Sequence, residues 1–416
     1  MARLQPVRGT RDLLSDEYAR HRVVADIARA TVERSGFAEA ATPIFEFTEV
    51  FNRTLGETSD IVTKEMYTFA DRGGESLTLR PENTAGFARA VISGGLTQSL
   101  PLKYFYSGPM FRYERPQKGR LRQFHQIGIE LIGVGEPLGD IEVIVLAADV
   151  LQALGLLDQT VLELNSLGDA KSRQAYREAL VGYFSQHREA LSDDSRARLE
   201  RNPLRILDSK NEGDRQIIEN APLIADHLNA ASSAFFAAVQ EGLALSGVAF
   251  TVAPRLVRGL DYYCHTAFEF TTDSLGAQGA VIAGGRYDKL IETMGGPPTP
   301  GVGWAGGIER LAMMLSDAPV VARPVALIPL GEPAERVVLE LAAGLRRAGV
   351  SIDLGYRGNL AKRLKRANKI NARVALILGD DEIAANIVTL RDLDSGEQEA
   401  VPLDPATLLT RLHPAG

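Results

Sequence analysis

The chain has 416 residues, 45% of them hydrophobic and 24% charged, so it is too apolar for a disordered protein and long enough for roughly two or three domains. Its single cysteine, Cys264, can close no intramolecular disulfide and build no thiolate zinc cluster, which excludes a disulfide-built secreted fold and indicates a cytoplasmic protein. The formal charge of −7 argues against a whole-molecule nucleic-acid coat but allows local basic surfaces. We expect no secretion signal, because no apolar run follows the first basic residues of the sequence. We also expect no membrane partner, because the longest apolar run, at 143–157, is shorter than the roughly 20 residues that cross a bilayer.

The segment 79–86 carries Glu82 and Thr84 directly before an apolar helical pattern. Acidic and hydroxyl side chains at such a position most often cap the helix or supply charge to its first turn. A helix start is therefore the simpler interpretation, and a ligand-binding role is the alternative.

Two strand patterns follow, at 104–112 and 124–132. In the second, strict alternation places Gln126, Gly128 and Glu130 on the face opposite the apolar Ile127 and Ile129. The amide and the carboxylate are about 13 Å apart along the strand, with a glycine between them where a ligand can approach the backbone. This face is either the polar floor of a small-molecule site or the solvated face of an amphipathic strand.

The loop between these strands is strongly basic. It contains one acid, Glu114, and five bases, namely Arg112, Arg115, Lys118, Arg120 and Arg122. The planar fork of arginine matches phosphate oxygens, so the loop suits a nucleotide triphosphate or an RNA backbone, unless it is merely a solvated charged turn.

Apolar side chains then recur at helical spacing between 170 and 247, in two runs: Tyr176, Leu180 and Phe184, and Phe235, Val239 and Leu243. We expect a helical domain, at 170–250, inserted into an α+β unit that occupies 1–169 and 251–321. Alternating strands, long helices and glycine pairs in that unit predict an antiparallel sheet.

Two further segments lie at the end of this unit. Residues 258–263 set a cation, an acid and two phenols beside a glycine, which is either part of a site or a hydrogen-bonded turn in the core. Residues 301–310 form a glycine-rich strand that runs into a helix, and they place Arg310 near the helix start, where glycines admit a planar ring or a phosphate. The chain contains no Walker A loop, and this segment is not a dinucleotide fingerprint.

After a linker at 317–324, strand and helix patterns alternate and predict a C-terminal α/β domain at 322–416 on a largely parallel sheet. Asn359 is a suitable N-cap for the second helix, and Gly349 a suitable residue to end the first. One face of that second helix is basic, and its members are Lys362, Lys365, Arg366 and Lys369. A helix that is merely soluble would interleave acids, so this face favours RNA binding.

Together these segments resemble the class II aminoacyl-tRNA synthetases, and specifically the histidyl-tRNA synthetase family. Residues 111–126 are similar to motif 2 of the class, 301–310 to motif 3, and 42–46 to the motif 1 region at the dimer interface. Residues 258–263 and 283–288 resemble two signatures peculiar to the histidine enzymes. The resemblance implies a class II antiparallel-sheet catalytic core with a helical insertion, a C-terminal α/β anticodon-binding domain and a homodimer.

The resemblance also implies residue roles. The histidine substrate would be bound by Glu82, Asn83, Thr84, Arg112, Gln126, Glu130, Arg258, Tyr262 and Tyr263, with Glu130 and Tyr263 at the imidazole. ATP would be held by Arg112, Arg120 and Arg310, and the catalytic cations would be Arg258, Arg112 and Arg310. Contacts with tRNA fall to Arg115, Gln117, Lys362, Lys365, Arg366 and Lys369.

The implied reaction joins L-histidine to the 3′ end of tRNA(His) through histidyl-adenylate, with ATP as substrate and Mg²⁺ on its phosphates rather than on an assigned protein ligand. His125, His265 and Cys264 are expected to be structural, and Trp304 to lie beside the pocket. Two alternatives are a non-charging histidine-sensing paralogue that regulates ATP phosphoribosyltransferase and a synthetase for another amino acid. The complete 258–263 signature argues against both, and the basic helix argues against the regulator.

Overall fold

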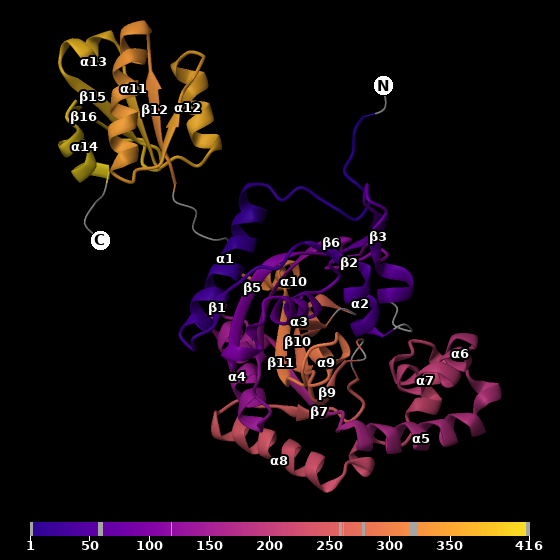
Figure 1. Ribbon diagram of the computed structural model, residues 1–416. Helices are drawn as coiled ribbons and strands as arrows, with labels where there is room; N and C mark the ends of the chain where they lie inside the picture. The colour runs from indigo at the N-terminus through magenta and orange to yellow at the C-terminus, as the bar shows by residue number, and fades with distance from the viewer. Residues whose placement is uncertain are drawn as a thin grey trace. The chain divides into compact units, whose positions relative to one another are not determined.

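The computed structural model describes residues 3–56, 61–117, 119–257, 260, 262–276, 279–316 and 323–412. The chain divides into two compact units, Met1–Pro319 and Val320–Gly416 (Figure 1). Most of the expected linker, at 317–322, lies outside the described residues, so the proposed domain limits stay a prediction.

The first unit is built on an eight-stranded sheet that is antiparallel through its centre. The strands, in spatial order, are β1 (Ala38–Glu39), β5 (Leu102–Phe111), β6 (Gln123–Ile132), β11 (Gly301–Gly307), β10 (Ala280–Arg286), β9 (Cys264–Thr271), β7 (Val161–Ser166) and β8 (Thr251–Val252). Only the two outermost pairings, β1 with β5 and β7 with β8, are parallel. The α+β class with an antiparallel sheet, predicted from strand alternation, is confirmed.

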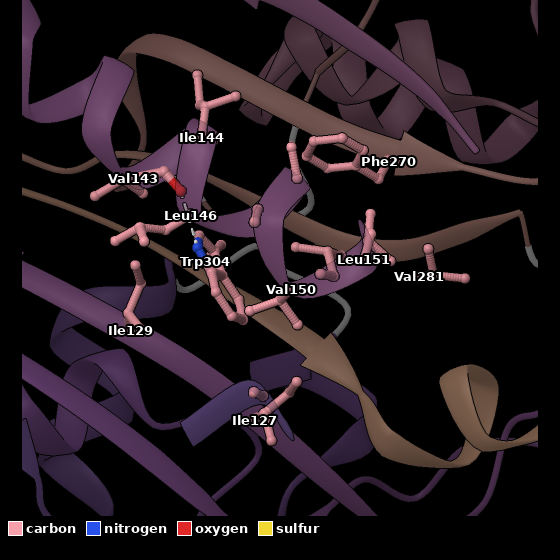
Figure 2. Packing of buried hydrophobic residues seen from close by; sticks show 14 of the residues in the cluster. Ile127, Ile129, Val143, Ile144, Leu146, Val150, Leu151, Phe270, Val281 and Trp304 are labelled. Atoms are coloured by element: carbon pink, nitrogen blue, oxygen red, sulfur yellow. Dashed lines mark hydrogen bonds between the residues drawn. The ribbon is translucent and has the colours of Figure 1, made fainter. Parts of the chain in front are cut away.

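One face of this sheet carries the main hydrophobic core. Against it pack α1 (Ser15–Glu33), α4 (Pro137–Ala153), α8 (Ala230–Leu245) and α10 (Ile308–Met314). Figure 2 shows Trp304 among Ile129, Val143 and Val150, with its indole nitrogen donating to the carbonyl oxygen of Val143 at 3.0 Å. The residue also lines a cavity on β11, so the expectation that Trp304 lies beside the pocket is confirmed, while its ring lies in the core. Strand alternation explains this, because Trp304 pairs with Ile129 of the core face.

A second, three-stranded sheet precedes the basic hairpin in sequence. It has the order β2 (Phe45–Phe47), β4 (Ser76–Leu79) and β3 (Tyr67–Ala70). Helices α2 (Thr48–Leu55), α3 (Thr84–Ser93) and α9 (Leu290–Thr293) share a further apolar cluster with Tyr262, Tyr263 and Tyr287. This cluster brings the helix start at Thr84 beside residues that lie about two hundred positions later in the chain.

The helical segment consists of α5 (Ala170–Gln186), α6 (Asp193–Arg201), α7 (Glu212–Ile218) and α8. Tyr176, Leu180 and Phe184 are buried in a small cluster of their own with residues of α6 and α7. Val239 and Leu243 of α8 instead belong to the main core. A separate small core therefore gathers α5 to α7, and α8 covers the large sheet.

The second unit is a five-stranded mixed sheet with flanking helices. Its strands run β13 (Ile352–Leu354), β12 (Val325–Pro329), β14 (Val374–Leu378), β15 (Ile387–Asp392) and β16 (Gln398–Pro402). Its helices are α11 (Glu332–Arg347), α12 (Leu360–Lys369), α13 (Asp380–Ala384) and α14 (Pro405–Leu412). The largely parallel sheet is confirmed only for β12, β13 and β14, because β15 and β16 add an antiparallel hairpin.

The predicted caps of this unit are present. The Asn359 side chain accepts a hydrogen bond from the backbone nitrogen of Lys362 at 3.1 Å and so begins α12. Gly349 follows α11 with a φ of 87°, a conformation that favours glycine. In the described ranges of both units, no helix is long and apolar enough to cross a membrane.

Candidate active site

A cavity of about 580 Å³ opens on the face of the large sheet opposite the main core. Its wall draws on strands β6, β9, β10 and β11, on the basic hairpin and on the starts of α3 and α10. Among its lining residues are Glu82, Thr84, Tyr106, Arg112, Glu114, Arg120, Gln126, Tyr262, Tyr263, Glu269 and Arg310. The structure thus gathers into one cavity most of the residues that the resemblance implied for histidine and ATP.

Glu130 lies beneath this cavity and is 1% exposed. It accepts hydrogen bonds from the Thr84 hydroxyl, at 2.7 Å, and from the Tyr287 phenol. Burial raises the pKa of Glu130 to about 8, and the two hydroxyl donors oppose that rise. Gly303 on the neighbouring strand makes room for this carboxylate, since a Cβ there would lie 2.3 Å from its Oε2.

Gln126 lines the cavity from the same strand face. Its Oε1 is buried and meets no hydrogen-bond donor among the described residues. A buried, unpaired amide oxygen carries a free-energy cost that a ligand N–H would relieve.

Gly128, between them, plays a different part from the expected one. A Cβ at this position would lie 2.4 Å from the Tyr106 phenol oxygen. The glycine therefore admits the Tyr106 ring, which itself lines the cavity, and the interpretation that a ligand approaches the backbone at Gly128 is wrong.

Glu82 combines the two roles weighed for it. Its carboxylate accepts hydrogen bonds from the backbone nitrogens of Thr84, at 2.7 Å, and Ala85, at 3.0 Å, in the first turn of α3. It also lines the cavity, and the Tyr262 phenol donates to it at 3.5 Å. Burial raises the pKa of Glu82, while the two amides and Arg112 lower it.

Asn83 lies behind the cavity wall rather than in it. It is 1% exposed, and its Oδ1 accepts hydrogen bonds from the Thr42 hydroxyl at 2.6 Å and from Arg80 at 3.1 Å. These contacts connect the start of α3 to the segment before β2. Asn83 is not among the described residues that line the cavity.

Three arginines line the same cavity, and one of them, Arg112, lies near enough to Glu82 to lower its pKa. Arg112 donates to the carbonyl oxygen of Pro81 at 2.9 Å, and Arg310 to that of Ala280 at 2.6 Å. Arg120 pairs with Glu114. Burial lowers the pKa of Arg310, and the charges of Arg120 and Arg112 lower it further. Because these cations repel one another, the part of the cavity that they line favours an anion with several charges.

The remaining predicted residues divide between the cavity wall, the hairpin loop and the part of the chain that the structure does not describe. Tyr262 and Tyr263 both line the cavity, with ring centroids 4.6 Å apart. Arg115 and Gln117 are exposed on the hairpin loop and do not line it. Arg258, predicted to be catalytic, lies outside the described residues, as do Asp261 and Lys118.

The sequence analysis did not single out Tyr106, Tyr287 or Glu269 for the site. Tyr287 falls within the 283–288 signature, and Glu269 alternates with the buried Phe268 and Phe270 on β9. Both signals are present in the sequence, but neither says which distant strand each side chain meets.

Two groups expected to be structural have packing contacts that fit that interpretation. The His265 ring packs on the Phe235 ring with centroids 4.8 Å apart. Cys264 is buried, and burial raises the pKa of its thiol to about 12, so it stays protonated near neutral pH.

In the second unit, the side chains of Lys362, Lys365, Arg366 and Lys369 are exposed on α12. Arg366 pairs with Asp353 at 2.8 Å, which offsets part of its charge. Arg363 of the same helix is buried against the carbonyl oxygens of Gly358 and Pro329. The outward basic face consists of the four predicted residues.

Comparisons with known proteins agree with this geometry. The family model described as Histidyl-tRNA synthetase matches residues 9–311, and that described as Anticodon binding domain matches 324–407. The chain is 64% identical to the histidine–tRNA ligase of Rhodospirillum rubrum and 58% identical to that of Gluconacetobacter diazotrophicus. These alignments cover 97% and 98% of this chain, and the same shares of the relatives.

Solved structures give the same result. The apo histidyl-tRNA synthetase of S. aureus matches with a TM-score of 0.82 and 33% identity, over 98% of this chain and 99% of that one. A structure titled ATP phosphoribosyltransferase regulatory subunit/histidyl-tRNA synthetase, from Bacillus halodurans, is 23% identical with a TM-score of 0.62, which shows a shared fold alone. Fold, site and relatives define an ATP-dependent aminoacyl-tRNA ligase with an anticodon-binding domain. Within that class, the chain belongs to the histidyl-tRNA synthetase family.

Proposed function

We propose that the cavity holds L-histidine and ATP side by side and joins them as histidyl-adenylate before transfer to tRNA(His). The observation that carries this proposal is a single cavity that combines two kinds of side chain. Glu82 and Gln126 line it above the buried Glu130, and three arginines line it as well. A zwitterionic amino acid beside a polyphosphate is complementary to that combination.

In this proposal, Glu82 and the Oε1 of Gln126, which has no donor among the described residues, accept from the ammonium group of histidine beside Thr84. Glu130, which lies beneath the cavity and accepts from the Thr84 hydroxyl, accepts the N–H of the imidazole. An ionised carboxylate offers only acceptors, so it selects a side chain that presents a donor at that depth. The raised pKa of Glu130 means that histidine binding and loss of a proton from this carboxyl are linked.

Arg112 and Arg310 bind the phosphates, supported by Arg120. The histidine carboxylate oxygen attacks the α-phosphorus in line, the bond from that phosphorus to the bridging oxygen breaks, and pyrophosphate leaves. The 3′-hydroxyl of the tRNA then attacks the activated carbonyl and releases AMP. Side chains supply position and positive charge rather than a nucleophile, and Arg258 acts at the α-phosphate with Arg112.

Magnesium fits the carboxylates on the cavity wall. Glu269 lines the cavity and lies opposite Glu163 in the register of β9 and β7. Burial and the charge of Glu269 raise the pKa of Glu163. Mg²⁺ prefers one or two carboxylates together with phosphate oxygens, so Glu269 would hold it beside the ATP phosphates. The ion would neutralise charge on the β- and γ-phosphates.

Further expectations concern partners. The basic face of α12 contacts the anticodon arm of tRNA, while Arg115 and Gln117 contact the acceptor end. The exposed aromatic rings of Phe45 and Phe47, with Ile44, form an apolar patch that a second copy of the chain would cover in a homodimer. We propose the cytoplasm as the site of action, because the substrates and tRNA reside there.

The test is histidine-dependent exchange of pyrophosphate into ATP, followed by charging of tRNA(His). Glu130→Gln should lower kcat/KM for histidine about 10- to 100-fold, and Arg258→Ala should lower kcat. Arg336→Ala, at an exposed position of α11 in the second unit, is the control that leaves exchange unchanged. Absence of exchange in the wild type would overturn the proposal, and histidine binding without exchange would support the regulatory alternative.

A further inference from the structure

Two histidines and a glutamate form a polar cluster in the apolar interface between α1, β6 and α10. The ligand atoms of His21, His125 and Glu309 all lie within 4.8 Å of one another. His21 is 7% exposed and Glu309 6%, and the side chain of His125 is 25% exposed. These elements come from three distant parts of the chain, so the cluster is a product of the tertiary fold.

His21 occupies a core-facing position on α1. Val24, Ala28 and Val32 follow it on the same buried stripe and pack into the main core. Burial of an imidazole at that position removes its hydrogen bonds with water. An apolar side chain does not carry this free-energy cost. Its ring meets the His125 ring edge-on at 5.6 Å between centroids, and no hydrogen bond to the His21 ring occurs among the described residues. Packing leaves the His21 ring without a hydrogen-bond partner in the described parts of the chain, although ligand atoms of His125 and Glu309 lie within 4.8 Å.

Glu309 is already oriented toward the cluster. Its carboxylate accepts from the backbone nitrogen of His125, at 2.9 and 3.0 Å, and lies 2.9 Å from Nδ1 of the same residue. Hydrogen bonds of this kind fix a carboxylate in metal sites and hold its orientation before the ion arrives. Arg20 anchors α1 to the end of α10 through the carbonyl oxygen of Leu315, at 3.0 Å, and so limits movement of His21.

We propose that His21, His125 and Glu309 form a binding site for a divalent transition-metal ion, with Zn²⁺ as the ion that the donor set suits. Two imidazole nitrogens and one carboxylate oxygen are typical zinc ligands, and a water completes a tetrahedron. Tetrahedral zinc ligands stand about 3.3 Å apart, so the present spacing closes by a small rotation of the rings. Glu309 also lines the cavity that Glu269 lines, but the two sites differ in donors, because the one at Glu269 offers oxygen alone and this one offers two imidazole nitrogens.

The site joins elements that carry the catalytic cavity. Gln126 follows His125 on β6, and Arg310 follows Glu309 on α10. A bound ion would tie both to α1. Zinc binding should therefore stabilise the first unit against heat without contributing a group to the reaction.

The test measures binding of ZnCl₂ to the untagged full chain, in the absence of ATP, by equilibrium dialysis and by thermal unfolding. We expect one site of this kind per chain and a higher midpoint with zinc. His21→Gln should weaken binding at that site at least about tenfold and abolish the shift, while MgCl₂ produces neither effect. His187→Gln, which changes a histidine of the helical segment, should behave as the wild type.

A second variant keeps the test informative if His21→Gln changes packing. With CoCl₂, His21→Cys should show a thiolate-to-cobalt charge-transfer band that the wild type, despite its buried Cys264, does not show. Equal zinc affinity in the wild type and His21→Gln would overturn the proposal. The proposal would also be overturned by a His21→Cys variant that lacks the band although its thermal unfolding midpoint in EDTA equals that of the wild type. The equal midpoint would show that the variant is folded.

Discussion

The substitution Tyr287→Phe tests how hydrogen bonds set the pKa of Glu130, while the Glu130 side chain itself stays unchanged. The Tyr287 phenol donates to Oε2 of Glu130, and the Thr84 hydroxyl donates to Oε1. Removal of the phenol hydroxyl leaves the ring in its cluster with Tyr262 and Tyr263 and removes one of two donors from a fully buried carboxylate. The ionised form of Glu130 should therefore become less favourable.

The magnitude follows from the loss of one hydrogen bond to a charged group. Such a bond contributes about 1.5–3 kcal/mol, and one pKa unit corresponds to about 1.4 kcal/mol. The pKa of Glu130, already raised to about 8 by burial, should rise by roughly one to two units more. In the proposed function, histidine binding needs the ionised form. We therefore expect kcat/KM for histidine to rise with pH through this pKa in the wild type, and the rise to move to higher pH in Tyr287→Phe.

The assay is the pH profile of histidine-dependent pyrophosphate exchange, since kcat/KM reports the ionisation of the free enzyme. At pH 7, the variant should lose about 10- to 100-fold in kcat/KM for histidine and little in the KM for ATP. Tyr183→Phe, whose phenol bonds to the carbonyl oxygen of Ile217 in the helical segment, is the matched control. An unchanged acid limb in Tyr287→Phe would refute the assignment of this ionisation to Glu130.

Three further outcomes follow from other contacts. Arg310→Lys loses the planar fork at the cavity and should lower kcat/KM for ATP roughly 10- to 100-fold, with the KM for histidine nearly unchanged; equal effects on both substrates would contradict a phosphate role. Arg286→Met leaves Asp140 buried without its ion-pair partner and should cost about 3–5 kcal/mol in urea unfolding, most of it regained when Asp140→Leu is added. Lys362→Glu combined with Lys369→Glu should weaken tRNA binding and reduce its salt slope by roughly 2, while exchange without tRNA stays normal; an unchanged slope would remove α12 from the tRNA interface.

Local patterns predicted several elements well. The alternation in β6 separates Gln126 and Glu130 from the core residues, and the glycine-rich strand that ends in Arg310 runs into α10 as expected. Asn359 begins α12 because its side chain caps the helix within three residues. In each case the signal and the structure that it specifies lie within one turn or one strand.

Features that depend on contacts between distant segments could not be predicted from the sequence. Tyr287 reaches Glu130 across 157 positions, and Tyr106 fills the space that Gly128 leaves. Both depend on strand order, which alternation alone does not define. The hairpin of β15 and β16 had a local signal in the turn around Gly396, and its omission produced the expectation of a largely parallel sheet.

The central claim is that one cavity binds histidine at its carboxylates and ATP at its arginines. A crystal structure of the chain with a non-hydrolysable histidyl-adenylate analogue tests it most directly. The account predicts the imidazole against Glu130, the ammonium group against Glu82 and Gln126, and the phosphate mimic against Arg112. An analogue bound in the reverse orientation, or outside this cavity, would contradict it.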